Sequence, residues 1–218
     1  MPDSYKTVYE RAKDSFEEKR SEFIGHIAPV ADEDQAVGFI NEIRSANRKA
    51  RHNVYAYILR NGNISRYSDD GEPQGTGGAP VLAVLKKEGL TDVCVVVTRY
   101  FGGVLLGTGG LARAYSTACK LVVDSARIME YHSCSRLTVA CDYNLYGRLT
   151  QLFSQYDVKV ENESFAEDVK LTLLVKTELS SAFIKKLMNA ANGRLEIEET
   201  TAVSYTHLRA HETRRHLV

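Results

Sequence analysis

The sequence predicts an α+β protein with two domains, and three observations lead to this prediction. Hydrophobic residues make up 44% and charged residues 26% of the 218 residues, a composition typical of a packed globular protein. Segments with strand alternation and segments with helical periodicity follow one another along the chain. From residue 135 onward the predicted order is β-α-β-β-α-β, the ferredoxin-like pattern. We therefore expect a first domain at residues 1–132 and a ferredoxin-like second domain at residues 135–202.

Cap and turn residues mark several elements of the first domain. Asp32 and the acidic residues after it fit a helix N-terminus, where the helix dipole favours negative charge. Asn61-Gly62 is a hairpin-turn pair, and Pro80 suits the first turn of a helix. The β-branched run that ends at Arg99 is typical of a central buried strand. The predicted strands lie at 7–14, 17–30, 53–60, 64–68 and 92–99, and the predicted helices at 32–47, 79–88 and 111–127.

The elements of the second domain follow from the same signals. Asn192-Gly193 is a C-terminal helix cap, because such residues adopt left-handed backbone readily. Ten of the fifteen glycines lie between Gly71 and Gly110, so we expect any ligand site in the first domain. The predicted strands of the second domain lie at 137–143, 158–165, 169–176 and 194–201, and its helices at 144–156 and 178–191.

Charge, hydropathy and cysteine content exclude several classes of protein. Twenty-eight basic and twenty-eight acidic residues give a net charge of zero, so affinity for nucleic acid needs a local patch. No apolar run approaches the roughly 18 residues of a membrane-spanning helix, and the first residues contain no apolar signal core. The four cysteines form no C-x-x-C pair. We therefore expect reduced thiols in a cytoplasmic protein, with no metal and no cofactor.

Residues 203–218 differ in composition from the rest of the chain. Three of the six histidines, His207, His211 and His216, lie there together with three arginines. His207 and His211 have the i, i+4 spacing of a metal-binding pair on a helix. The stretch also resembles translated adapter sequence, which does not contribute to a native fold. We expect a non-native tail without function.

Two glycine-rich loops form the main candidate binding site. Residues 69–80 and 99–113 each contain Gly-Thr-Gly-Gly directly before a predicted helix. Glycines at a helix N-terminus allow a ligand to approach unpaired backbone N–H groups, and the dipole there favours an anion. Glycine serves tight turns and close packing equally well, and this alternative stays open. The candidate ligand-binding residues are Arg51, His52, Asp69, Asp70, Gly75, Thr76, Gly77, Gly78, Arg99, Gly102, Gly103, Gly107, Thr108, Gly109, Gly110 and Arg113.

Asp69, Asp70 and Glu72 place three carboxylates within four positions. Such a group could ligate a metal or supply general acid–base chemistry, because neighbouring carboxylates shift one another's pKa. Asp-Asp-Gly is also a common turn whose aspartates accept local N–H bonds, and we favour this interpretation. No nucleophile with an adjacent base stands out, Cys94 lies in a predicted buried strand, and neither loop has the lysine of a P-loop.

The densest basic cluster lies at residues 44–52, at the predicted end of a helix. Cations at a helix C-terminus complement the dipole, so a solvated helix end is the simpler interpretation. The alternative is a phosphate-contacting patch with nearby tyrosines as stacking surfaces. The cluster contains Arg44, Arg48, Lys49, Arg51 and His52, and the tyrosines are Tyr55, Tyr57 and Tyr67.

Three segments resemble the YigZ/IMPACT family: ARHNVYAY at 50–57, SDDGEPQGTGG at 68–78 and VTRYFGGVLLG at 97–107. The likeness is close over residues 21–126 and looser over the second domain. The resemblance implies a first domain with the α/β sandwich fold of the second domain of a small-subunit ribosomal protein. It implies a second domain like the ferredoxin-like one in elongation factor G. Eukaryotic relatives act in translational control by competing for an activator of an initiation-factor kinase.

We therefore expect a translation-linked regulatory protein that binds RNA, the ribosome or a translation factor through its glycine loops, with no defined reaction. The alternative is a small-molecule hydrolase or nucleotide-binding enzyme that uses Asp69, Asp70, Glu72 and His52. In the binding hypothesis Arg99 and Arg113 contact phosphates. Replacing either arginine with alanine is then expected to leave the fold intact.

Overall fold

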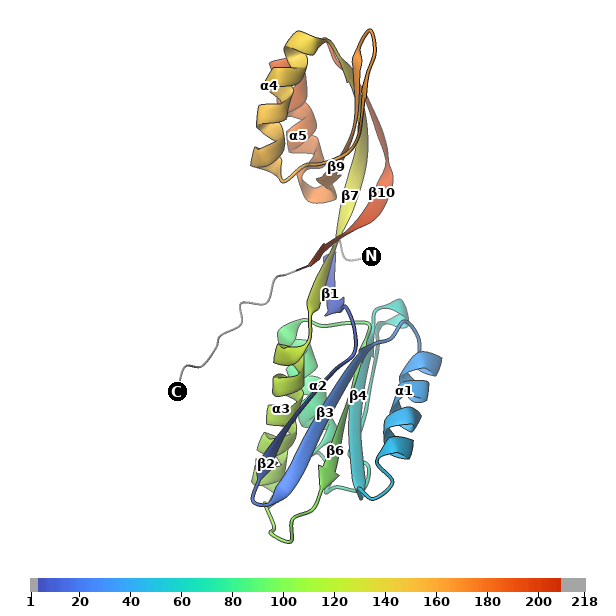
Figure 1. Cartoon of the computed structure of the whole chain (residues 1–218), viewed down its shortest axis with the longest axis vertical. Coiled ribbons are helices and arrows are strands. Elements are labelled where there is room, and N and C mark those ends of the chain that lie inside the picture. Colours follow the sequence, from blue (N-terminus) through green and yellow to red (C-terminus); the bar gives the residue numbers. More distant parts are fainter. Residues whose placement is uncertain (1–3, 209–218) are drawn as a thin grey trace. The chain divides into compact units, whose positions relative to one another are not determined.

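The computed structural model describes residues 4–208, and of residues 201–208 it describes the backbone only. The described residues form two five-stranded sheets and five α-helices (Figure 1). They divide into an N-terminal unit, Tyr5–Glu130, and a C-terminal unit, Tyr131–His207. The predicted fold class, a mixed α and β protein of two domains, is confirmed.

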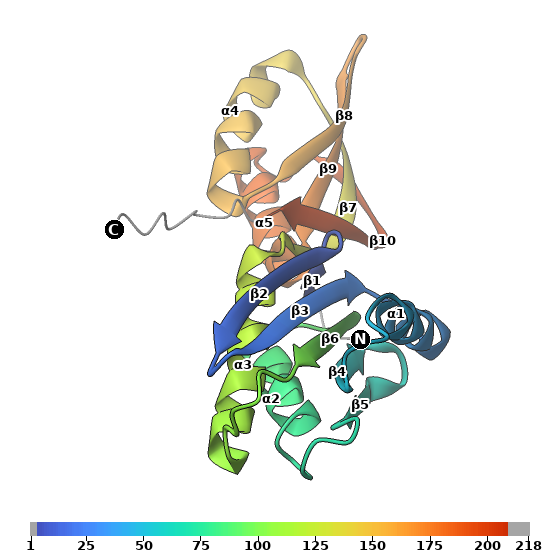
Figure 2. The same cartoon turned by 60° about the horizontal axis from the view of Figure 1, so that its bottom comes forward.

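An antiparallel sheet forms the centre of the N-terminal unit. Its strand order is β2-β3-β6-β4-β5. Helix α1 covers one face of this sheet, and α2 and α3 cover the other (Figures 1 and 2). The strands are β2 (Ala12–Glu18), β3 (Ser21–Pro29), β4 (His52–Leu59), β5 (Ile64–Ser68) and β6 (Val93–Tyr100), and the helices are α1 (Glu33–Ala46), α2 (Gly78–Glu88) and α3 (Thr108–Ser125). A short 3-10 turn, Asn61–Asn63, joins β4 to β5.

Strand β6 is buried on both faces, as its β-branched run predicts. Val95 and Val97 pack toward α2 and α3, whereas Cys94 and Val96 pack toward α1. Burial also raises the pKa of the Cys94 thiol to about 12, which fits an inert core thiol. Because side chains alternate along a strand, this register fixes the face on which the last residues of β6 lie.

The first hairpin differs from the prediction. A separate short strand, β1 (Ser4–Val8), precedes β2, and the turn between β2 and β3 lies at Lys19-Arg20 instead of residues 14–17. Both turn residues have positive φ, 48° and 63°, as a two-residue hairpin of type I′ requires. Glycine and asparagine usually provide this conformation, so Lys-Arg gives no turn signal in the sequence.

The C-terminal unit has the predicted β-α-β-β-α-β order. Within this unit β8, β9 and β7 are neighbours in that order, and β10 also pairs with β7. The apolar side chains between this sheet and the two helices form a second core that includes Leu137, Leu149 and Phe183. The elements are β7 (Ile128–Cys141), α4 (Tyr143–Phe153), a 3-10 turn (Ser154–Tyr156), β8 (Lys159–Phe165), β9 (Val169–Lys176), α5 (Thr177–Ala190) and β10 (Glu196–Leu208).

Two strands of this unit are longer than the sequence predicts. Strand β7 begins at Ile128, nine residues before the predicted start at Leu137. Strand β10 continues to Leu208 and so includes the first part of the expected tail from residue 203. That part contains Val203, Tyr205 and Thr206, residue types that favour strands. Residues 209–218, with His211 and His216, lie outside the described residues.

No helix within residues 4–208 has the length and apolar character needed to cross a membrane. No group of three or more acidic, histidine or cysteine side chains is placed to hold a metal in this part of the chain. All four cysteines are buried, and none of them forms a disulfide bond.

His26 makes the stability of the N-terminal unit pH-dependent. Its Nε2 atom is buried without a hydrogen-bond partner in the described structure. Burial lowers the pKa of His26 from 6.5 to about 4, and the charge of Lys13 acts in the same direction. Between these pH values the unfolded chain binds more protons, so stability is complete above about pH 6.5 and is lost as pH falls toward 4.

Acidification from pH 7.5 to pH 4.5 should lower the free energy of unfolding by about 1–2 kcal/mol through His26, because the unfolded chain binds the proton that the folded chain excludes. The loss is smaller than the whole pKa shift implies, since the side chain is partly exposed to solvent. Urea denaturation of the wild type and of His26→Leu at both pH values measures this contribution. The variant should lose less stability on acidification by that amount. An equal loss in both proteins would contradict the assignment.

Candidate functional site

In the first glycine loop, residues 69–80, the side chain of Asp69 binds backbone N–H groups of the loop itself. The Asp69 carboxylate accepts the backbone N–H groups of Gly75, Gly77 and Gly78 at 2.8, 2.9 and 2.8 Å. Burial acts to raise the pKa of Asp69, but these three bonds outweigh it and the pKa is lowered. The start of α2 therefore already holds an anion, which occupies the N–H groups of Gly77 and Gly78.

Packing explains several glycines of the two loops. A Cβ atom on Gly78 would lie 2.7 Å from the carbonyl oxygen of Ser68, and one on Gly77 would lie 2.8 Å from a Val54 methyl. In the second loop, a Cβ atom on Gly102 would lie only 1.8 Å from a backbone oxygen. These glycines fit the alternative interpretation from the sequence, in which the backbone must pass close to its neighbours.

Asp70 also has structural partners. Its carboxylate accepts Arg44 Nη2 at 2.5 Å and the backbone N–H of Asn53 at 2.7 Å. Glu72 forms contacts with a different set of residues, so the three carboxylates diverge. This arrangement agrees with the turn interpretation for Asp69 and Asp70, whose carboxylates bind N–H groups. It gives no support to a joint metal site.

Only part of the basic cluster at residues 44–52 is exposed and unpaired among the described residues. Arg44 is paired with Asp70, and its guanidinium lies over the ring of Tyr55. Tyr57 is buried, and its hydroxyl donates to Glu33. Among the residues that the structure describes, no ion pair is formed by the exposed side chains Arg48, Lys49 and Arg51.

A buried ion pair lies between the two loops. Arg99 Nη1 donates to Glu72 Oε1 at 2.7 Å, and the Tyr115 hydroxyl donates to the same oxygen at 2.8 Å. The residues Arg99 and Glu72 are only 6% and 8% exposed. Burial, the charge of Glu72 and the bond to it all raise the pKa of Tyr115. The sequence predicts Arg99 as a phosphate contact whose loss leaves the fold intact. Because Arg99 is buried and paired with Glu72, we now expect its loss to destabilise the N-terminal unit.

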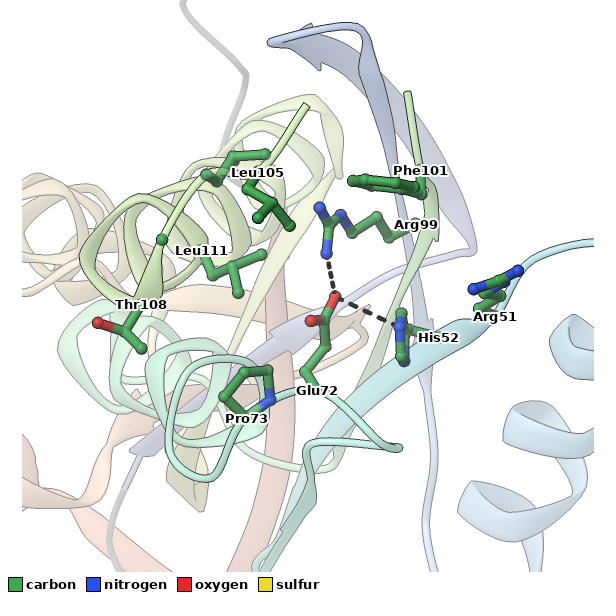
Figure 3. A pocket seen from close by; sticks show the side chains of 11 residues that line it. Arg51, His52, Glu72, Pro73, Arg99, Phe101, Leu105, Thr108 and Leu111 are labelled. Carbon is green, nitrogen blue, oxygen red and sulfur yellow. Dashed lines mark hydrogen bonds and ion pairs between the residues drawn. The ribbon is translucent and has the colours of Figure 1, made fainter. Parts of the chain in front are cut away.

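Strand register brings these side chains together. Arg99 on β6 is the cross-strand partner of Phe23 on β3 and of His52 on β4. His52 Nε2 lies 4.0 Å from Glu72 Oε1, and its Nδ1 lies 2.9 Å from the carbonyl oxygen of Asp70. Because a carbonyl only accepts, Nδ1 carries a proton. Figure 3 shows Glu72 between Arg99 and His52.

The second glycine loop leads into α3 with an open first turn. Gly107 precedes the helix with φ of 73°, a conformation that suits glycine, and no side chain caps the helix there. A Cβ atom on Gly109 would meet only the end of Arg113, at 4.0 Å. Neither packing nor backbone conformation therefore requires glycine at position 109. Arg113 is exposed and forms no ion pair among the described residues.

A pocket of about 400 Å³ joins the ion pair to the start of α3. Of the residues predicted from the sequence, it brings together Arg51, His52, Arg99, Gly107 and Thr108. The other predicted residues do not line it. Its further lining residues are Glu72, Pro73, Phe101, Leu105, Leu106 and Leu111 (Figure 3).

The apolar wall of this pocket is absent from the sequence prediction. Phe101, Leu105, Leu106 and Leu111 give no chemical signal by themselves. A clue lies in the sequence nonetheless, because the run Val104-Leu105-Leu106 follows two glycines in a loop. An apolar run in a loop is unusual unless it packs or binds something.

Comparison with known proteins finds relatives over both units. Residues 19–123 match the Impact N-terminal domain, and residues 139–194 match a domain of unknown function, DUF1949. The chain is 34% identical over 200 residues to IMPACT family member YvyE of Bacillus subtilis, covering 91% of this chain and 92% of that protein. It is 32% identical over 182 residues to IMPACT family member YigZ of Escherichia coli, covering 82% and 89%.

Two further comparisons differ in how much of the chain they cover. Protein IMPACT homolog of Dictyostelium discoideum is 38% identical over 97 residues, which are 43% of this chain and 28% of that protein. A crystal structure described as that of an hypothetical protein superposes with a TM-score of 0.58 and 29% identity, covering 90% of this chain and 97% of the other.

Proposed function

Because the chain belongs to the IMPACT family, we propose that it is a translation-linked regulatory protein whose N-terminal unit binds RNA phosphates at the first turn of α3. The translational role is the one that the family resemblance implies. The observation that carries the binding role is the contrast between the two glycine loops. Asp69 fills the first, whereas the first turn of α3 has no side-chain cap.

The chemistry of that turn suits a phosphate. Unpaired N–H groups at a helix N-terminus point outward, and the dipole of the 18-residue helix adds partial positive charge. The exposed cations Arg51 and Arg113 lie at this site, one lining the pocket and the other beside Gly109. A chain with zero net charge needs such a local concentration of donors to bind a polyanion.

The enzyme alternative has less support. Of its four residues, only Glu72 and His52 line the pocket. Asp69 and Asp70 bind N–H groups of their own surroundings. Glu72 is tied to Arg99 and Tyr115 in a buried pair, so it is poorly placed to exchange protons with a substrate.

The test uses fluorescence anisotropy of a labelled single-stranded ribo-oligonucleotide. We expect the wild type to bind it, with an affinity that falls as salt rises, because phosphate contacts release counterions. Arg113→Ala should make the slope of log affinity against log salt shallower by about 0.7, the contribution of one contact. Lys87→Ala is the matched control, since Lys87 is an exposed cation on α2 that does not line the pocket. Equal slopes for Arg113→Ala and wild type, or no RNA binding, would contradict the proposal.

A further inference from the structure

We infer that the pocket between Glu72, Arg99 and the start of α3 holds a single unstacked nucleotide. In this arrangement the base lies in the pocket and its phosphate lies at the first turn of α3. The inference rests on the proposed function for the RNA source of that nucleotide. It adds to that function a base-binding pocket, which phosphate binding alone does not need.

The walls of the pocket suit the faces of a base. Eight large hydrophobic side chains are exposed among the residues that the structure describes, and three of them, Phe101, Val104 and Leu105, lie in this one loop. Leu105 is 81% exposed and Phe101 is 48% exposed, although both line the pocket. Such an exposed apolar group marks a binding surface. An aromatic side chain such as Phe101 next to a phosphate site is the usual platform for an unstacked base.

The inner end of the pocket suits the edge of a base. Arg99 lies there with its guanidinium 5.5 Å from the ring centre of Phe23 and 5.3 Å from that of Phe101. Arg99 Nε is buried and has no hydrogen-bond partner in the described structure. A buried donor without a partner is costly, so a ligand group that reached it would gain a hydrogen bond. Glu72 adds an acceptor beside this donor, and base edges carry both kinds of group.

The start of α3 completes the match. Gly107 and Thr108 line the pocket, so the open first turn of α3 faces the same space as the apolar wall. The volume of about 400 Å³ lies within the roughly 300–1,000 Å³ of small-molecule sites. The buried polar groups, the apolar wall and the anion site at α3 correspond to the edge, the faces and the phosphate of one nucleotide. A purely aliphatic anion would leave the inner donor unpaired.

The experiment compares ligands that carry only part of this chemistry. Isothermal titration calorimetry of the full chain with adenosine 5′-monophosphate and with uridine 5′-monophosphate should show binding. Ribose 5-phosphate, which lacks the base, should bind at least about tenfold more weakly, since stacking of one base is typically worth that factor or more. Equal affinity for ribose 5-phosphate would overturn the inference, because the site would then bind phosphate alone.

Two variants test the wall. Phe101→Ala and Leu105→Ser should each weaken nucleotide binding by about tenfold while the fold stays intact, because both side chains are exposed. Val37→Ser is the matched control, since Val37 is 48% exposed on α1 and does not line the pocket. Unchanged affinity in both wall variants would overturn the inference.

A labelled ribo-oligonucleotide with and without one abasic position separates this inference from the proposed function. If both oligonucleotides bind equally well, RNA binding stands and the base pocket is wrong. If mononucleotides bind and neither oligonucleotide does, the pocket stands and the RNA source is wrong. If neither class of ligand binds, both are wrong. The expected result is tighter binding of the intact oligonucleotide.

Discussion

Arg99→Ala is expected to lower the free energy of unfolding of the N-terminal unit by about 3–5 kcal/mol. The variant removes the guanidinium that lies 2.7 Å from Glu72 and leaves a carboxylate that is 8% exposed without its cation. The hydroxyl of Tyr115 remains, but one neutral donor does not replace a buried charge. Urea denaturation followed by circular dichroism measures the loss.

Two further variants show that the unpaired charge is the cause. Arg99→Ala combined with Glu72→Gln should recover part of the loss, because the double variant buries no unpaired charge. Arg113→Ala, at an exposed arginine, should stay within about 0.5 kcal/mol of the wild type. A loss below about 1 kcal/mol in Arg99→Ala, or no recovery in the double variant, would show that this pair does not hold the unit together.

Gly102→Ala is expected to destabilise the same unit by about 3 kcal/mol or more. The added Cβ would lie 1.8 Å from the backbone oxygen of Arg20, in the turn between β2 and β3. A backbone atom cannot move aside as a flexible side chain can, so the loop or the turn must shift. The N–H of Gly102, which donates to the hydroxyl of Ser21, would shift with it.

The matched control is Gly109→Ala in the same loop region. Its Cβ would meet only the end of Arg113, at 4.0 Å, and alanine favours the helix over glycine by up to about 1 kcal/mol. The control should therefore be as stable as the wild type or slightly more stable. Thermal and urea denaturation of the two variants make the comparison. Similar stabilities would contradict the packing that we assign to Gly102.

Much of the fold follows from periodicity and from a few special residues. Asp32 was predicted as an N-cap, and its side chain accepts the N–H of Gln35 at 2.8 Å. The valines of β6 predicted a strand buried on both faces, and both cores contain them. The turn at Lys19-Arg20 was missed because neither residue type usually adopts positive φ.

The candidate site was predicted only in part, because its contacts depend on tertiary structure. Asp69 binds N–H groups six, eight and nine residues along the chain, and no local pattern specifies that. The position of Arg99 depends on strand register, which places it beside Phe23 and His52. Once β6 is known to carry Val95 and Val97 on the α3 face, alternation assigns Arg99 to that face too.

The central claim, that the first turn of α3 binds RNA phosphates, is tested most directly by the salt dependence of RNA affinity in the wild type and in Gly109→Val. With about three or four phosphates bound, the wild-type slope of log affinity against log salt should be near −2 to −3, at about −0.7 per contact for single strands. Gly109→Val should keep the fold, since its Cβ meets only open space and Arg113, but block the approach of the ligand and lower affinity at least about tenfold. A slope near zero, or unchanged affinity in a folded Gly109→Val, would contradict the account.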